Sequence, residues 1–155
     1  MHLFLVRHAE AVDETRTLAD PDRHLTAAGR AAARALGERM RWYDCEPTAV
    51  WSSPLMRAVQ TAELVIPGLG YTGLIECAPA LAPGGSVRDL CAALAKITGQ
   101  VLVVGHEPGL SAIGAVLTGR GDFPALKKAQ AARIDDGRLR WLFATTDEAP
   151  VPVPA

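Results

Sequence analysis

An apolar strand that stops abruptly at an Arg-His pair is the feature that most limits how this chain can fold. Leu3–Val6 is a short, unbroken apolar run, which is typical of a central parallel strand buried on both faces. Arg7 and His8 follow at its carboxyl end, where open α/β sheets bind their ligands. The guanidinium favours phosphate or carboxylate as the ligand, and the histidine can attack, move protons or bind a metal. Taken alone, a strand-capping histidine beside a solvated arginine explains the pair better, so partners elsewhere have to decide.

A second strand repeats this arrangement. Gln100–Val104 is the clearest buried strand of the chain, and Gly105-His106-Glu107-Pro108-Gly109 follows it. Because proline suits the first position of a helix, His106 is predicted to lie at a strand end and at a helix N-terminus together. Two buried strands thus each deliver a histidine.

A further strand, Ala49–Ser52, is predicted between these two along the chain. Ser53-Pro54 after it predicts a helix with the serine as N-cap and the proline at the first helical position, running to about Ile66 and ended by Pro67-Gly68. Arg57 lies on the first turn, where the helix dipole and free backbone N–H groups favour an anion. Taken by itself, Arg57 is more simply an exposed helix arginine.

The remaining segments complete an alternation of strands and helices. They are a helix from Leu25-Thr26 to about Trp42 with Thr26 as N-cap, a strand at Leu74–Cys77, a helix at Val87–Ile97 after Ser86, and a hairpin of Ala129–Ile134 with Arg138–Thr145. This order predicts an α/β fold: a three-layer αβα sandwich whose mainly parallel central sheet carries helices on both faces and a C-terminal hairpin at its edge. Residues 1–148 are expected to form one domain, and residues 149–155 an extended, frayed Pro-rich tail.

Composition excludes several classes of function. With 155 residues, a net charge of −1 and a balance of both signs, the chain fits one domain with no global attraction to nucleic acid or to a membrane. Its three cysteines are widely spaced and its N-terminal apolar run is too short for a signal peptide, which predicts a cytoplasmic protein. No H-E-x-x-H or paired-cysteine spacing occurs, so neither a metal nor another cofactor is expected. The oligomeric state is left open, with a monomer favoured.

Together these segments resemble the histidine phosphatase superfamily, which has the phosphoglycerate-mutase-like fold. Four motifs occur in the family's order, namely Arg7-His8-Ala9 for Arg-His-Gly, Leu25-Thr26-Ala27-Ala28-Gly29 for Leu-Thr-x-x-Gly, Ser53-Pro54-Leu55-Met56-Arg57-Ala58-Val59-Gln60-Thr61 for Ser-Pro-x-x-Arg-x-x-x-Thr, and Gly105-His106-Glu107-Pro108 for the second histidine segment. The short chain, the Arg-His-x-acid start and the arginine before Leu-Thr are most similar to the SixA-type phosphohistidine phosphatases.

The resemblance implies a role for each site residue. His8 would be the nucleophile and would carry a phosphohistidine intermediate, with no metal required. The residues implied to hold the phosphate oxygens and stabilise the transition state are Arg7, Arg57 and His106. The residues expected to bind the substrate are Arg23, Glu10 and Ser53.

Two positions depart from the family's pattern. Ala9 replaces the glycine after the catalytic pair, which matters only if the backbone there needs a positive φ, and this is not expected. Ala80 stands where many relatives place a glutamate that protonates a leaving alkoxide. Because imidazole is a far less basic leaving group, its absence favours P–N over P–O substrates. Glu10, Glu76 or Glu107 are alternative proton donors, although each is more simply a solvated or capping carboxylate.

The sequence therefore predicts a metal-independent phosphatase that hydrolyses phosphohistidine on a protein, such as a phosphotransfer domain. The short connections support this prediction, because they would leave a shallow site open to a protein surface. A phosphatase for small phosphomonoesters or sugar phosphates is the alternative enzyme. An inactive phospho-binding module is disfavoured, because the family's four core positions are filled, by Arg7, His8, Arg57 and His106.

Overall fold

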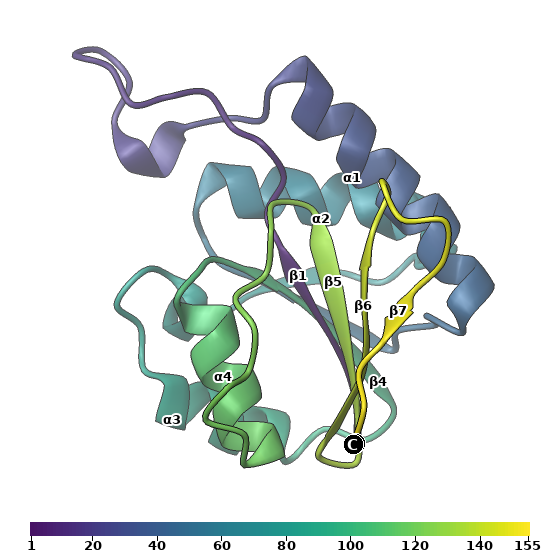
Figure 1. Cartoon of the computed structure of the whole chain (residues 1–155). Helices are drawn as coiled ribbons and strands as arrows, with labels where there is room; N and C mark the ends of the chain where they lie inside the picture. The colour runs from purple at the N-terminus through teal and green to yellow at the C-terminus, as the bar shows by residue number, and fades with distance from the viewer.

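The apolar strands predicted from the sequence form the middle of one seven-stranded sheet, with a pair of helices on each face (Figure 1). This computed structural model describes all of residues 1–155. The strands are β1 (His2–Arg7), β2 (Ala49–Ser52), β3 (Ile75–Cys77), β4 (Gln100–Gly105), β5 (Gln130–Asp135), β6 (Arg138–Ala144) and β7 (Val151–Pro152). The helices are α1 (Ala27–Met40), α2 (Met56–Leu69), α3 (Val87–Leu94) and α4 (Gly109–Thr118), with short 3-10 turns η1 (Asp20–Asp22), η2 (Arg41–Tyr43) and η3 (Pro79–Leu81). No helix has both the length and the apolar character needed to cross a membrane.

The sheet has the strand order β3-β2-β4-β1-β5-β6-β7. The strands from β3 to β1 are parallel, whereas β5, β6 and β7 each run antiparallel to the strand before them in this order. The predicted α/β class with a mainly parallel core is therefore confirmed. Arg7 lies opposite Gly105, and Ser52 lies opposite Val104. The residues that follow β1, β2 and β4 consequently meet at the carboxyl end of these parallel strands.

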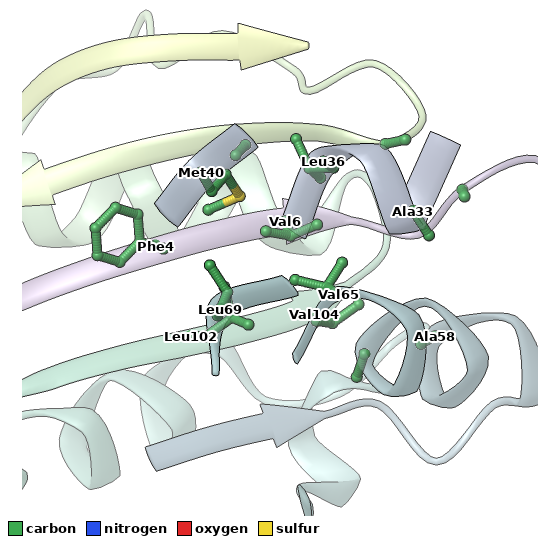
Figure 2. Packing of buried hydrophobic residues seen from close by; sticks show 14 of the residues in the cluster. Phe4, Val6, Ala33, Leu36, Met40, Ala58, Val65, Leu69, Leu102 and Val104 are labelled. Atoms are coloured by element: carbon green, nitrogen blue, oxygen red, sulfur yellow. The ribbon is translucent and has the colours of Figure 1, made fainter. Parts of the chain in front are cut away.

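The central strands bury side chains on both faces. On one face, Phe4 and Val6 of β1 and Leu102 and Val104 of β4 pack under α1 and α2 (Figure 2). The intervening residues of the same strands pack with α3 and α4 on the other face. Since burying each such side chain contributes roughly 1.5–3 kcal/mol, β1 and β4 are firmly held where they deliver their terminal residues.

Helix α2 starts later than predicted. Its N-cap is Leu55 and its first residue is Met56, so Ser53 is not the cap. The Ser53 hydroxyl still accepts a hydrogen bond from the Leu55 nitrogen at 3.2 Å, but it also contacts a histidine side chain. The shift leaves Arg57 on the first turn of the helix, as the sequence predicts.

Helix α2 also ends later than predicted. It continues through Pro67 to Leu69 and stops at Gly70, whose φ of 71° lies in the left-handed region that favours glycine. Gly68 packs directly on α1, where a Cβ would lie 2.4 Å from the Glu38 nitrogen. Contact between the two helices therefore outweighs the stop signal that proline and glycine give in the sequence.

The other helices need smaller corrections. Thr26 caps α1 as predicted, accepting a hydrogen bond from the Gly29 nitrogen at 3.0 Å. Ser86 caps α3 in the same way, but α3 ends at Leu94 and not at Ile97. The caps predicted for α1 and α3 are therefore confirmed, and only the ends of these two helices were misplaced.

The C-terminal segment is paired, although a frayed tail was predicted. Val151–Pro152 forms β7 against β6, and the Val153 nitrogen donates to the Arg140 oxygen at 2.9 Å. Arg39 of α1 donates to three backbone carbonyl oxygens just before β7. The hairpin of β5 and β6 therefore lies inside the sheet, and the sheet edge on this side is β7.

Gly37 provides a test of the packing of α1 on α2. A Cβ at this position would lie 2.1 Å from the backbone oxygen of Val65. Alanine is normally favoured over glycine inside a helix by about 1 kcal/mol. Here we expect Gly37→Ala to lower the free energy of unfolding by roughly 1–3 kcal/mol, because the helix backbones must separate. The melting temperature should fall by about 2–4 °C for each kcal/mol lost.

Gly121→Ala is the control, since no heavy atom lies within 4 Å of a Cβ there. It reports how replacing glycine affects the unfolded chain alone. A melting temperature for Gly37→Ala equal to or above that of the wild type would contradict the close packing of the two helices.

Candidate active site

The ends of three neighbouring strands bring His8, His106 and Ser53 together. The His8 nitrogen donates to the Gly105 oxygen at 3.0 Å, and the Ser53 nitrogen donates to the Val104 oxygen at 3.0 Å. The two imidazole ring centroids lie 5.1 Å apart, and both histidines are buried. The hydrogen bonding of the sheet thus continues for one residue past β1 and past β2, which fixes the backbone positions of His8 and Ser53.

The backbone assigns the tautomer of His8. Its Nδ1 lies 2.7 Å from the Ala9 carbonyl oxygen, which can only accept, so Nδ1 carries the proton and Nε2 keeps its lone pair. The Ala9 nitrogen donates to Thr61 Oγ1 at 3.0 Å, and the φ of Ala9 is not positive, so alanine fits here as expected. Burial lowers the pKa of His8 to about 4, and the positive charges of Arg57 and Arg7 act in the same direction. The His8 ring is therefore neutral at physiological pH, with a free lone pair on Nε2.

Ser53 sets the orientation of His106. The His106 Nε2 lies 2.7 Å from Ser53 Oγ, and that oxygen already accepts from the Leu55 nitrogen. We assign the serine proton to the bond with Nε2, which places the imidazole proton of His106 on Nδ1. Burial lowers the pKa of His106 to about 3, with His8 and Arg57 adding to the effect. His106 is thus a neutral hydrogen-bond donor, and Ser53, which is fully buried, holds it.

The two core arginines are anchored by backbone carbonyl groups. Arg57, which is buried, donates from Nη1 to the Asp20 oxygen at 2.9 Å and lies 3.3 Å from Asp20 Oδ2 through Nη2. Arg7 donates from Nη1 to the Leu126 oxygen at 2.9 Å. These contacts use both outer nitrogens of Arg57 and only Nη1 of Arg7, while the Nε of each arginine has no protein partner.

Three unpartnered donors distinguish this site from the rest of the molecule. Four buried side-chain nitrogen atoms have no hydrogen-bond partner, and three of them are Arg7 Nε, Arg57 Nε and His106 Nδ1. A buried donor without a partner costs about 1–3 kcal/mol, and proteins keep few of them. Arg7 and Arg57 both act electrostatically on His8 and His106, which places all four in one neighbourhood. The arrangement suits an anion with several acceptor oxygens held beside the His8 lone pair.

Arg23 and Glu10, the other predicted substrate contacts, are occupied by protein groups. Arg23 donates from Nε to the Val12 oxygen at 2.7 Å and forms an ion pair with Asp20 at 3.0 Å. Glu10 is exposed and accepts from Thr26 Oγ1 at 2.9 Å, beside the start of α1. The structure therefore places Arg23 near the core site only through Asp20, and places Glu10 at the N-terminus of a helix.

Asp20 is the site residue that the sequence analysis missed. Its carboxylate and carbonyl groups contact both Arg57 and Arg23, and the hydrogen bond from Arg23 lowers the pKa of Asp20, helped by the charge of Arg57. The signal available was an Asp-Pro-Asp turn in an unusually long polar loop before Arg23.

Among the predicted proton donors, Glu107 has both carboxylate oxygens bound by other protein groups. Glu107 accepts from the Leu126 nitrogen through Oε1 and from Ser111 through Oε2, and Glu76 is exposed on the edge strand β3. Ala80 on η3 lines an apolar pocket of about 240 Å³ together with His106. The protein contains no group of three or more His, Cys, Asp or Glu side chains that could hold a metal ion.

Comparison with known proteins identifies relatives of this fold. Residues 3–82 match the family model described as the histidine phosphatase superfamily (branch 1). The phosphohistidine phosphatase SixA of Escherichia coli (strain K12) is 32% identical over 112 residues, which cover 70% of this chain and 68% of that protein. An uncharacterized protein of Picosynechococcus sp. is 30% identical over 160 residues, covering 96% and 93%. The solved structure of a protein histidine phosphatase SixA complexed with tungstate has a TM-score of 0.87 at 28% identity, covering 94% of this chain and 98% of that one.

The low pKa values of the two histidines give a direct test of the site. We expect both rings to be neutral at pH 5.5, with midpoints near pH 4 for His8 and near pH 3 for His106 in an NMR titration. The same histidines in the unfolded chain bind their protons near pH 6.5. The free energy of unfolding should therefore be highest above that pH and should fall as the pH drops towards 4.

His8→Asn and His106→Asn variants should each lose part of this pH dependence. A midpoint near pH 6.5 for either ring in the wild type would mean that the imidazole is solvated and would remove it from the buried site described here.

Proposed function

Because the chain belongs to branch 1 of the histidine phosphatase superfamily, we propose that this phosphatase hydrolyses phosphohistidine on a protein, through a covalent phosphate on His8. The observation that carries the proposal is that three buried N–H groups without a partner belong to Arg7, Arg57 and His106. The charges of both arginines act on His8, and the His106 ring centroid lies 5.1 Å from that of His8. The similar protein solved with tungstate supports it, since tungstate is a tetrahedral oxyanion like phosphate. The three cysteines form no disulfide, which fits the cytoplasmic location that we propose for this activity.

In the first step, the Nε2 lone pair of His8 attacks phosphorus. The P–N bond of the substrate breaks, and the departing imidazole nitrogen keeps the electron pair and takes a proton from solvent. Arg7 Nε, Arg57 Nε and His106 Nδ1 donate to the oxygens of the transferring group, where they stabilise its negative charge. The Ala9 carbonyl group keeps the proton of His8 on Nδ1 and stabilises the positive charge that the phosphorylated ring gains.

In the second step, a water oxygen attacks phosphorus and loses a proton to solvent. The bond to His8 Nε2 breaks, and the neutral ring and inorganic phosphate are regenerated. The same three donors serve both steps, because the phosphate oxygens remain in place while the two apical groups exchange. No step requires a metal.

The missing proton donor sets the proposed substrate class. The carboxylates of Glu10 and Glu107 already accept hydrogen bonds from other protein groups, and Ala80 has no polar group to offer. A leaving alkoxide needs a proton in the transition state, whereas imidazole is a weaker base and leaves more easily. This difference favours phosphohistidine, and the name of the similar phosphohistidine phosphatase agrees with it.

The proposal predicts a strong dependence of rate on the leaving group. The protein should hydrolyse a phosphohistidine protein and aryl phosphates, and alkyl phosphates such as glycerol phosphates should react poorly. Ala80→Glu should raise alkyl phosphate hydrolysis by on the order of 10²-fold, with little gain on phosphohistidine, because a positioned acid assists only the basic leaving group. Steady-state kcat/KM values on these three substrate classes provide the measurement.

Ala80→Gln is the matched control, since it has the size of glutamate but no proton to transfer. Equal rates on alkyl phosphates and phosphohistidine in the wild type would mean that Glu10 or Glu107 donates the proton after all. The preference for P–N substrates would then be withdrawn, and a phosphatase for small phosphate esters would replace it.

A further inference from the structure

Glu107 follows His106 in the chain, yet its carboxylate joins two other segments. Oε2 accepts from the nitrogen and the hydroxyl group of Ser111, at 3.2 and 2.6 Å, in the first turn of α4. Oε1 accepts from the nitrogen of Leu126 at 2.9 Å, in the segment between α4 and β5. Glu107 is partly buried, so these bonds are shielded from competing water. The carboxylate therefore links the end of β4, the start of α4 and the segment around Leu126.

Leu126 in turn fixes Arg7. While its nitrogen donates to Glu107, its carbonyl oxygen accepts from Arg7 Nη1 at 2.9 Å, the one side-chain hydrogen bond of that arginine. The Leu126 side chain is buried in the core on the face of α3 and α4. Leu126 is thus held by its side chain and by Glu107, and its carbonyl group is placed for Arg7.

The residues that follow Leu126 are tied to the same strand end. The Ala129 nitrogen lies 3.2 Å from the backbone oxygens of both Arg7 and His8. Ala129 has a φ of 52°, an uncommon conformation for alanine, so this turn is closely specified. The segment from Leu126 to Ala129 consequently supports the backbone of Arg7 and His8 as well as the guanidinium group.

We propose that Glu107 is a positioning residue for phosphate binding, which acts through Leu126 to hold the Arg7 guanidinium with its Nε donor towards the phosphate. The inference rests on the proposed function, since it assigns Arg7 to the phosphate. An arginine side chain has many rotamers, and restraining it before the ligand arrives lowers the entropy lost on binding. Glu107 thereby prepares an interaction that it does not itself make.

A role for Glu107 as proton donor fits this geometry less well. Each of its oxygens accepts from a backbone N–H group, and a carboxyl that donates a proton to the substrate would have to leave these partners. Such a movement would also release Leu126. The hydrogen bonds therefore favour support of Arg7 over proton transfer.

A double-mutant cycle on phosphate affinity tests the inference. Inorganic phosphate is titrated by calorimetry into the wild type, Glu107→Ala, Arg7→Ala and the double variant. We expect Glu107→Ala to weaken binding about tenfold in the wild-type background, as for loss of one hydrogen bond to a charged group, and less than twofold in the Arg7→Ala background. Ser111→Ala, which removes only the hydroxyl contact in α4, should stay within twofold of the wild type.

Glu107→Gln guards against a variant that fails to fold. Its amide oxygen can still accept from the Leu126 nitrogen, so it should recover most of the affinity that Glu107→Ala loses. Thermal unfolding of each variant checks that all are folded at the titration temperature. Recovery by glutamine is expected for a positioning role and would not occur if the negative charge itself mattered.

Three outcomes would overturn the inference. They are an unchanged affinity in Glu107→Ala, an equal loss in both backgrounds, and a loss of alkyl phosphate turnover in Glu107→Gln with no change in phosphate affinity, which would make Glu107 the proton donor. If the effects of Glu107→Ala and Arg7→Ala on phosphate affinity are coupled but phosphohistidine is not hydrolysed, the proposed substrate is refuted and the role of Glu107 stands. A wild type that binds no phosphate would refute both.

Discussion

Parallel hydrogen bonding between β1 and β4 sets the register in which Arg7 lies opposite Gly105, and the geometry of the site depends on this pairing. Because side chains alternate across a strand, a slip of one residue would carry the His8 side chain away from His106. The apolar residues buried on both faces of these strands make such a slip costly. The sheet therefore sets where the two imidazole rings begin, and the bonds to Ala9 and Ser53 orient them with their centroids 5.1 Å apart.

In this site the arginines are charged and the buried histidines are neutral. An anion is attracted by positive charge, whereas a nucleophilic imidazole must stay neutral, so one histidine cannot serve both needs well. Here the arginines supply the charge, and burial lowers the pKa of each histidine far enough to keep it neutral. Asp20 occupies the outer nitrogens of Arg57 and leaves its Nε without a protein partner. Protein groups thus hold the guanidinium groups of Arg7 and Arg57 while their Nε atoms remain without a partner.

Local patterns in the sequence were enough for the strands β1 to β6, for their order along the chain and for the family, because an apolar run that ends in a polar motif can be recognised without knowing the fold. They were not enough where one residue has two possible uses. Ser53 carries an N-cap signal but holds His106, and Pro67 carries a stop signal but lies inside α2, since packing on α1 prevails. Asp20 was missed because its contact with Arg57 joins residues 37 positions apart. The pairing of β7 was missed because proline is rare in strands, and only an edge tolerates it.

The identity of the residue that carries phosphate during turnover decides whether His8 is the nucleophile. The wild type is mixed with radiolabelled phosphohistidine protein, turnover is stopped rapidly under denaturing alkaline conditions that preserve P–N bonds, and the labelled site is mapped by mass spectrometry. We expect phosphate on Nε2 of His8, because Nδ1 donates its proton to the Ala9 carbonyl oxygen. His8→Ala, which lacks the imidazole, should carry no label. Label on His106, or turnover without any labelled histidine, would contradict it.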